Sequence, residues 1–121
     1  MAVRMNADAI IETLESVDVD QLGFGVIGFD DQGIVRVYNQ TESEAAGLSR
    51  SRVLGFHVFE SVAPCMNNFL VAQRFEDAAR DKIVLDITID YILTLRMRPT
   101  PVHLRLLYGP EARYRYILVE R

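Results

Sequence analysis

The hydrophobic residues of this chain recur with a helical period near the N-terminus and with a strand period over much of the remaining sequence. In the stretch "NADAIIETLESV", four apolar residues fall on one side of a helix: Ile10, Ile11, Leu14 and Val17. Asn6, which precedes them, is a residue type that caps helices. The pattern predicts a short amphipathic helix over residues 7 to 16, which needs an apolar surface to lie on.

Five segments have the composition or the alternation of β-strands. The runs "FGVIGFD" and "IVRVYN" are separated by "DQG", whose glycine can take a positive φ, and together they predict a hairpin within residues 24 to 39. Apolar and polar residues alternate again over residues 85 to 93. Two further runs, "VHLRLLY" and "YRYILVE", come after turn-rich connections and predict the last two strands.

The segment between the second and third strands is predicted to be helical. Short pieces there end at Gly47, Gly55 and Pro64, which are helix-stopping residues. The stretch "NNFLVAQRFEDAARDK" then predicts a longer helix at about 68 to 81, with an Asn cap. Its apolar side would carry Phe69, Leu70, Ala72, Phe75 and Ala79.

This order of elements indicates an α+β fold. We expect a five-stranded antiparallel sheet with the helices gathered on one face and the short N-terminal helix on the other. A pocket would then lie between the helices and the sheet.

Composition and charge narrow the function classes. A chain of 121 residues, half of them hydrophobic, makes one domain with one sizeable core. The net charge of -4 and the dispersed Lys and Arg residues disfavour nucleic acid and anionic membranes as partners. The apolar runs are too short to span a bilayer, and the acidic N-terminus does not resemble a signal peptide, so we expect a cytoplasmic protein.

Cys65, in "SVAPCM", is the only cysteine and therefore cannot form an intrachain disulfide. A lone cysteine among apolar residues is usually a small buried hydrophobe. A thiol enzyme with Cys65 as nucleophile and His57 as base is a second interpretation, although no third group or oxyanion loop can be named for it. His57 and His103 have no partner at metal-ligand spacing, so no metal is expected.

The sequence "FGVIGFDDQGIVRVYNQTESEAAGLSRSRVLG" resembles the PAS domain, and the resemblance extends over nearly the whole chain. Within that superfamily, "YNQTE", the later "VLG" and then "VAPC" resemble the photoactive yellow protein family. The resemblance implies a blue-light receptor that carries p-coumaric acid (4-hydroxycinnamic acid) as a thioester on Cys65. It also implies a PAS-type chromophore-binding domain over residues 21–121 and an N-terminal helical cap over residues 1–20.

By the same resemblance, Tyr38 and Glu42 hydrogen-bond the phenolic oxygen of the chromophore. The chemistry is consistent, because a phenol ionises near pH ~10 and burial raises that value unless donors stabilise the anion. A Glu42 kept neutral by burial can donate its proton, and a spacing of four residues lets both side chains converge. In light, isomerisation and proton transfer from Glu42 would leave a costly buried charge, which local unfolding of the N-terminal helix would relieve.

The expected apolar lining of the pocket is Ile27, Ala46, Leu48, Val62 and Ala63. Two of these residues depart from the family pattern: Ala46 stands where a threonine usually supports the tyrosine, and Leu48 where an arginine often shields the chromophore. The phenolate is therefore expected to be held less firmly. Met97, in the loop over residues 94–101, is not assigned to the pocket.

Other interpretations remain open at this point. Glu42 alone could be a solvated acid on a short polar helix, and Tyr38 an ordinary packing residue of a strand. The main alternative function is a PAS module without a covalent chromophore, which binds another ligand or a protein. The expected partner is an unidentified downstream signalling protein, with a weak homodimer through the sheet or the N-terminal helix as a further possibility.

Overall fold

The computed structural model describes residues 7–94 and 99–121, and its centre is a five-stranded antiparallel sheet in the order β2-β1-β5-β4-β3. The strands are β1 (Gly25–Phe29), β2 (Val35–Tyr38), β3 (Leu85–Leu93), β4 (Thr100–Tyr108) and β5 (Arg115–Glu120). This confirms the predicted α+β fold with five strands. The order places the first and last strands side by side, so β5 lies in the middle of the sheet between β1 and β4.

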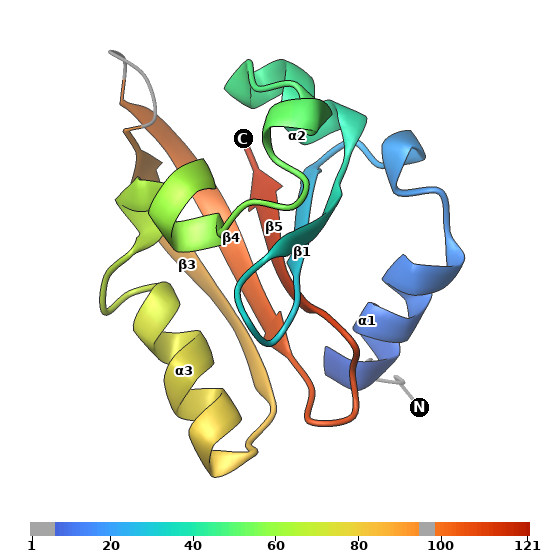
Figure 1. The fold of residues 1–121 in the computed structure, drawn as a ribbon, viewed down its shortest axis with the longest axis vertical. Coiled ribbons are helices and arrows are strands. Elements are labelled where there is room, and N and C mark those ends of the chain that lie inside the picture. The colour runs from blue at the N-terminus through green and yellow to red at the C-terminus, as the bar shows by residue number, and fades with distance from the viewer. Residues whose placement is uncertain (1–6, 95–98) are drawn as a thin grey trace.

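Three α-helices flank this sheet: α1 (Ala7–Ser16), α2 (Gln40–Ala46) and α3 (Ala72–Asp81). Short helical turns connect them to the strands, namely η1 (Val19–Gln21), η2 (Arg50–Arg52), η3 (Val58–Val62) and η4 (Pro64–Met66). Figure 1 shows α1 on one side of the sheet and α3 on the other. Within the described ranges, no helix has the length and apolar character that crossing a membrane requires.

The alternation of side chains along the strands divides the apolar residues into two layers. In β5, Ile117 and Val119 face the large cluster under α3 and the helical turns, whereas Tyr116 and Leu118 face the smaller cluster under α1. The smaller cluster also contains Ala7, Ile11 and Leu14 of α1. The N-terminal helix therefore packs on the opposite face of the sheet, as the sequence predicts.

The β1–β2 hairpin is held at its turn by a glycine. Gly33 has a φ of 83°, which favours a residue without a side chain. A Cβ at this position would lie 2.3 Å from Nε2 of His57, so the turn also leaves room for that ring. The Val58 N–H donates to the Gly33 carbonyl at 2.8 Å, which fixes the start of η3 against the hairpin.

The first turn of the predicted helix at 68 to 81 is not helical. Asn68 Oδ1 accepts hydrogen bonds from the backbone N–H groups of Leu70 and Val71 at 3.0 and 3.2 Å, and α3 begins only at Ala72. Phe69 is 85% exposed and Leu70 is half exposed, so the prediction that they belong to the apolar side of the helix is wrong. An Asn side chain that bonds to nearby backbone competes with helix formation, which explains the late start. Asn6, the predicted cap of α1, lies outside the described residues.

Candidate functional site

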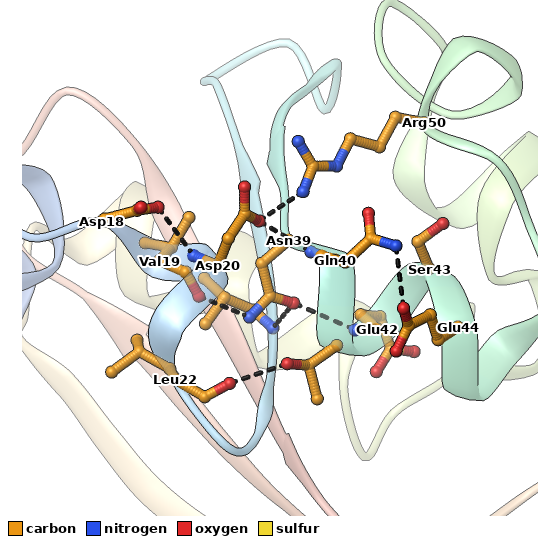
Figure 2. A network of polar contacts seen from close by, with 12 residues as sticks. Asp18, Val19, Asp20, Leu22, Asn39, Gln40, Glu42, Ser43, Glu44 and Arg50 are labelled. Carbon is orange, nitrogen blue, oxygen red and sulfur yellow. Dashed lines mark hydrogen bonds and ion pairs between the residues drawn. The ribbon is translucent and has the colours of Figure 1, made fainter.

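Asn39 fixes the start of α2 and thereby the position of Glu42. Its Oδ1 accepts from the backbone N–H groups of Glu42 at 3.1 Å and Val26 at 2.9 Å. Its Nδ2 donates to the carbonyl groups of Val19 and Phe24, both at 2.9 Å. The side chain is fully buried, so these bonds satisfy it without water. Figure 2 shows how this one residue joins α2 to β1 and to the segment after α1.

Tyr38 ends β2, and Glu42 follows four residues later in the first turn of α2. Tyr38 is 4% exposed and Glu42 is 1% exposed, so Glu42 is not the solvated acid of the simplest interpretation. Burial raises the pKa of Tyr38 well above its usual range, and the nearby charge of Glu42 raises it further, while Arg121 opposes the shift. Tyr38 therefore stays a neutral phenol that can donate a hydrogen bond.

Arg121, directly after β5, forms a bidentate ion pair with Glu42. Its Nη1 lies 2.7 Å from Oε1 and its Nη2 lies 3.1 Å from Oε2. The Glu42 side chain is 2% exposed and that of Arg121 is 26% exposed. The hydrogen bond to Glu42 raises the pKa of Arg121, against the opposing effect of burial. Gly25 makes room for the pair, because a Cβ there would lie 2.0 Å from Oε1 of Glu42.

Arg121 was not among the predicted site residues. Glu42 is 79 positions away in the sequence, and the two meet because Gly25 at the start of β1 pairs with Val119 near the end of β5. The signal that could have revealed a partner was Glu42 itself, since a buried carboxylate requires a cation or several donors. Which cationic side chain lies beside Glu42 depends on the strand order.

Cys65 lies in η4, directly after Pro64, and is a partly exposed free thiol. It packs against the large apolar cluster, to which Tyr38, Val62 and Ala63 also belong. Ile27 is buried in the same cluster. The structure thus gathers the predicted attachment residue, the predicted phenol and three predicted lining residues around one core; their contact with a chromophore stays a prediction.

The backbone of Cys65 is held by two residues that the sequence interpretation missed. The hydroxyl of Tyr91, in β3, donates to the carbonyl of Cys65. Asn68 Nδ2 donates to the same carbonyl at 3.1 Å and to the Tyr91 hydroxyl at 2.6 Å. The loop that carries the thiol is therefore attached to the outer part of the sheet.

The two residues that depart from the family pattern lie at the end of α2. Ala46 is buried, and Leu48 is partly buried against the large apolar cluster. Ser43 Oγ donates to the Leu48 carbonyl at 2.7 Å, so the turn after α2 is fixed by a side chain of the helix itself.

The two histidines have structural positions. His57 Nδ1 accepts from the backbone N–H groups of Phe59 and Glu60 at 3.1 and 3.2 Å, which caps η3 and leaves this nitrogen unsuited to act as a base for Cys65. His103 Nδ1 lies 2.7 Å from Asp90 Oδ1 on an exposed part of β3 and β4. Among residues 7–94 and 99–121, no cluster of His, Cys, Asp and Glu suits a metal ion. Met97 lies outside the described residues.

A groove of about 600 Å³ runs beside the ends of β3, β4 and β5. Tyr91 and Arg121 both line it, together with Leu70 and Val102. Tyr91 contacts the backbone of Cys65, and Arg121 contacts Glu42. One groove thus borders the partners of both predicted functional residues.

Comparisons of the sequence and of the structure with known proteins lead to the same family. No protein-family model matches the chain. The photoactive yellow protein of Halochromatium salexigens is 30% identical over 107 residues, which cover 86% of this chain and 85% of that protein. The photoactive yellow protein of Rhodothalassium salexigens is 29% identical over 103 residues, covering 85% and 82%. Among solved structures, the photoactive yellow protein domain of the sensor histidine kinase Ppr from Rhodospirillum centenum has a TM-score of 0.83 and 30% identity, and covers 92% of this chain and 99% of that one.

Proposed function

Because this chain belongs to the photoactive yellow protein family, we propose that it is a blue-light receptor carrying p-coumaric acid as a thioester on Cys65. The observation that carries the proposal is that a free thiol and the buried Tyr38 pack in one apolar cluster, with the buried Glu42 four residues after Tyr38. The family consists of sensory modules with a PAS fold, and a sensory role does not require the Cys65–His57 chemistry of a thiol enzyme.

The residues present fit the chromophore chemically. A thiolate can form the thioester, and Cys65 is partly exposed, so an activated acyl group can reach it. Ile27, Val62 and Ala63 supply apolar surface for an aromatic ring. Tyr38 is a neutral donor, and Glu42 is a buried carboxyl group four residues after it. A phenolate buried beside two donors is stabilised relative to the neutral phenol.

When bound, p-coumaric acid supplies visible absorption and a double bond that light isomerises. Tyr38 would then donate a hydrogen bond from its hydroxyl, and a protonated Glu42 would donate one from its carboxyl group, to the same phenolic oxygen. In light Glu42 would pass this proton to the phenolate and become a carboxylate next to Arg121. A buried charge that is not fully paired costs roughly several kcal/mol, and we propose that this cost drives a local rearrangement.

The first turn of α2 gives this rearrangement a route to the N-terminal segment. The Gln40 N–H donates to Asp20 Oδ1 at 2.8 Å, and Thr41 Oγ1 donates to the Leu22 carbonyl at 2.7 Å. With the Asn39 bond to Val19, three consecutive residues hold the segment over residues 19 to 22 (Figure 2). We therefore propose that residues 1–20 act as a cap on a sensing domain of residues 21–121, and that the cap detaches in light.

The partner of the proposed receptor is a signalling protein. The structurally similar domain from Rhodospirillum centenum is part of a sensor histidine kinase. Detachment of α1 would uncover the apolar residues Val26, Leu107, Tyr116 and Leu118 of the sheet. This surface is where a downstream protein, or a second copy in a weak homodimer, would bind the lit state.

Reconstitution tests the proposal. We expect the purified protein to turn yellow with activated p-coumaric acid and to gain the mass of one coumaroyl group. Cys65→Ala and Cys65→Ser, which keep the size of the residue small, are expected to give neither result because they lack the thiol. A coloured adduct on the alanine variant, or no adduct on the wild type, would overturn the proposal and favour a PAS module that binds a ligand without covalent attachment.

A further inference from the structure

The backbone carbonyl of Cys65 accepts two hydrogen bonds from side chains that lie outside its own helical turn. One donor is the hydroxyl of Tyr91 in β3, and the other is Nδ2 of Asn68, which lies between η4 and α3. We propose that Tyr91 and Asn68 are positioning residues, which fix the main chain of Cys65 and so hold the thiol in the direction from which it takes an aromatic acyl group. This inference rests on the proposed function, because it concerns how Cys65 is loaded.

The three groups form a closed set of hydrogen bonds. Asn68 Nδ2 lies 3.1 Å from the Cys65 carbonyl oxygen and 2.6 Å from the Tyr91 hydroxyl, and its two N–H groups can serve both acceptors. The Tyr91 hydroxyl accepts from Asn68 and donates to the carbonyl, which thereby uses both of its lone pairs. Connected bonds of this kind polarise and strengthen one another. The carbonyl therefore cannot turn without breaking both of its bonds.

Tyr91 attaches the loop that carries the thiol to a rigid part of the fold. β3 pairs with β4 along its whole length, and Tyr91 stands opposite Val102 in that pairing. The Tyr91 side chain packs against the large apolar cluster. A donor on a fully paired strand keeps its position better than a donor on a loop. Tyr91 thus fixes the distance between the Cys65 main chain and the sheet.

Asn68 attaches the same loop to the start of α3. Its Oδ1 accepts from the backbone N–H groups of Leu70 and Val71 at 3.0 and 3.2 Å, directly before the helix begins. On the other side of Cys65, Pro64 begins η4, and its ring restricts the backbone. The main chain at Cys65 is therefore held from both directions along the sequence, which fixes where its Cα–Cβ bond points.

A fixed direction matters because acyl transfer needs a defined approach to the thiol. In transfer from p-coumaric anhydride, the thiol proton goes to water and the thiolate sulfur forms a bond to one carbonyl carbon of the anhydride. The C–O bond of that carbon breaks, and the second coumarate leaves as a carboxylate with the electron pair. Misplacing a reacting group by about 1 Å can slow such a step by about a hundredfold. Because Tyr91 and Asn68 bind the main chain of Cys65, they act on this step through its geometry.

The first test observes the Cys65 carbonyl in the protein without chromophore. Because Cys65 is the only cysteine, cysteine labelled with ¹³C at its backbone carbonyl gives a single displaced amide I band in the infrared spectrum. We expect this band to move to higher wavenumber in Tyr91→Phe and in Asn68→Asp, since each variant removes one donor to the carbonyl. Asn68→Asp keeps the Oδ1 acceptor that caps the segment before α3, so it changes the donor alone.

Two matched variants are the controls for this band. Tyr114→Phe removes a hydroxyl from a tyrosine of the apolar cluster on the opposite face of the sheet. Asn67→Ala removes the exposed amide next to Asn68. Both are expected to leave the labelled band where it is in the wild type. A band that stays in place in Tyr91→Phe and Asn68→Asp as well would overturn the inference.

The second test compares how fast Cys65 reacts with two reagents. p-Coumaric anhydride delivers a planar aromatic acyl group, whereas iodoacetamide is small and can approach the thiol from several directions. In Tyr91→Phe and Asn68→Asp we expect the anhydride rate to fall by at least about fivefold and the iodoacetamide rate to stay within about twofold of the wild type. A loop that is merely looser would change both rates in the same direction, so the ratio of the two rates identifies positioning. An unchanged ratio would overturn the inference and leave the receptor function intact.

The double variant tests whether the two residues act on one carbonyl. Because the bonds form a single set, we expect Tyr91→Phe combined with Asn68→Asp to load no more than about twofold slower than the slower single variant. Effects that multiply in full would contradict the shared carbonyl. A wild-type protein that reacts with iodoacetamide but forms no adduct with the anhydride would overturn the receptor function, and the positioning role with it.

Discussion

Replacing Asn39 with alanine removes four hydrogen bonds at once, and the structure gives the expected cost. The variant leaves the N–H groups of Val26 and Glu42 and the carbonyl groups of Val19 and Phe24 without the partner they have at 2.9 to 3.1 Å. A hydrogen bond contributes about 1 kcal/mol net, so we expect a loss of about 4 kcal/mol in the free energy of unfolding. That is a large part of the roughly 5–15 kcal/mol by which a domain of this size is stable.

Urea unfolding followed by circular dichroism measures this loss. Asn67→Ala, at an exposed position, is the control and is expected to change the free energy of unfolding by less than about 0.5 kcal/mol. Asn39→Ser is the more informative variant, since serine can still cap α2 through the Glu42 N–H but cannot reach the two carbonyl groups. It is expected to recover about 1 kcal/mol of the loss.

Hydrogen exchange locates the effect. Both Asn39 variants are expected to speed amide exchange in residues 7 to 22, because the bonds to Val19 and Phe24 hold the end of this segment. The reasoning is refuted if Asn39→Ala costs less than about 1 kcal/mol and exchange in this segment is unchanged.

Two further predictions concern the acids around α2. In loaded protein, Glu42→Gln replaces a carboxyl donor with a weaker amide donor, so the absorption maximum is expected to move to the red by about 1 kcal/mol in excitation energy, because the ground-state phenolate loses more stabilisation than the excited state. An unchanged maximum together with unchanged light-induced exchange in residues 7 to 20 would remove Glu42 from the site. The hydrogen bond from Arg50, followed by that from the Gln40 N–H, lowers the pKa of Asp20. Asp20 therefore contributes stability above its unfolded pKa of about 3.9, and this contribution is lost as the pH falls through the lower folded value. In the wild type, the rate of amide hydrogen exchange in residues 7 to 22 is expected to rise in that acidic range. In Asp20→Asn the rate is expected to be high already at pH 7. Asp31→Asn, at an exposed position, is the control and is expected to exchange like the wild type.

The sequence by itself determined the local elements, because their periods are local properties. The helical spacing before Val17 and the alternation along residues 85 to 93 each match an element of the structure. The "YNQTE" and "VAPC" motifs also led to the prediction that Tyr38, Glu42 and Cys65 are site residues, since a motif is a run of neighbours. Where a side chain competes locally with the backbone, as Asn68 does at the start of α3, the apolar period alone predicted too long a helix.

The tertiary structure alone decided the electrostatic partners of the site. Glu42 meets Arg121 across 79 positions, and the carbonyl of Cys65 meets the hydroxyl of Tyr91 across 26. Both contacts depend on strand order and register, which place β5 beside β1 and β3 at the far edge of the sheet. A buried acid is expected to need a cationic partner, but from the sequence alone every arginine in the chain is a candidate until the strand order is known. Pairing between distant residues is set by the packing of whole elements, and no local pattern of side chains encodes it.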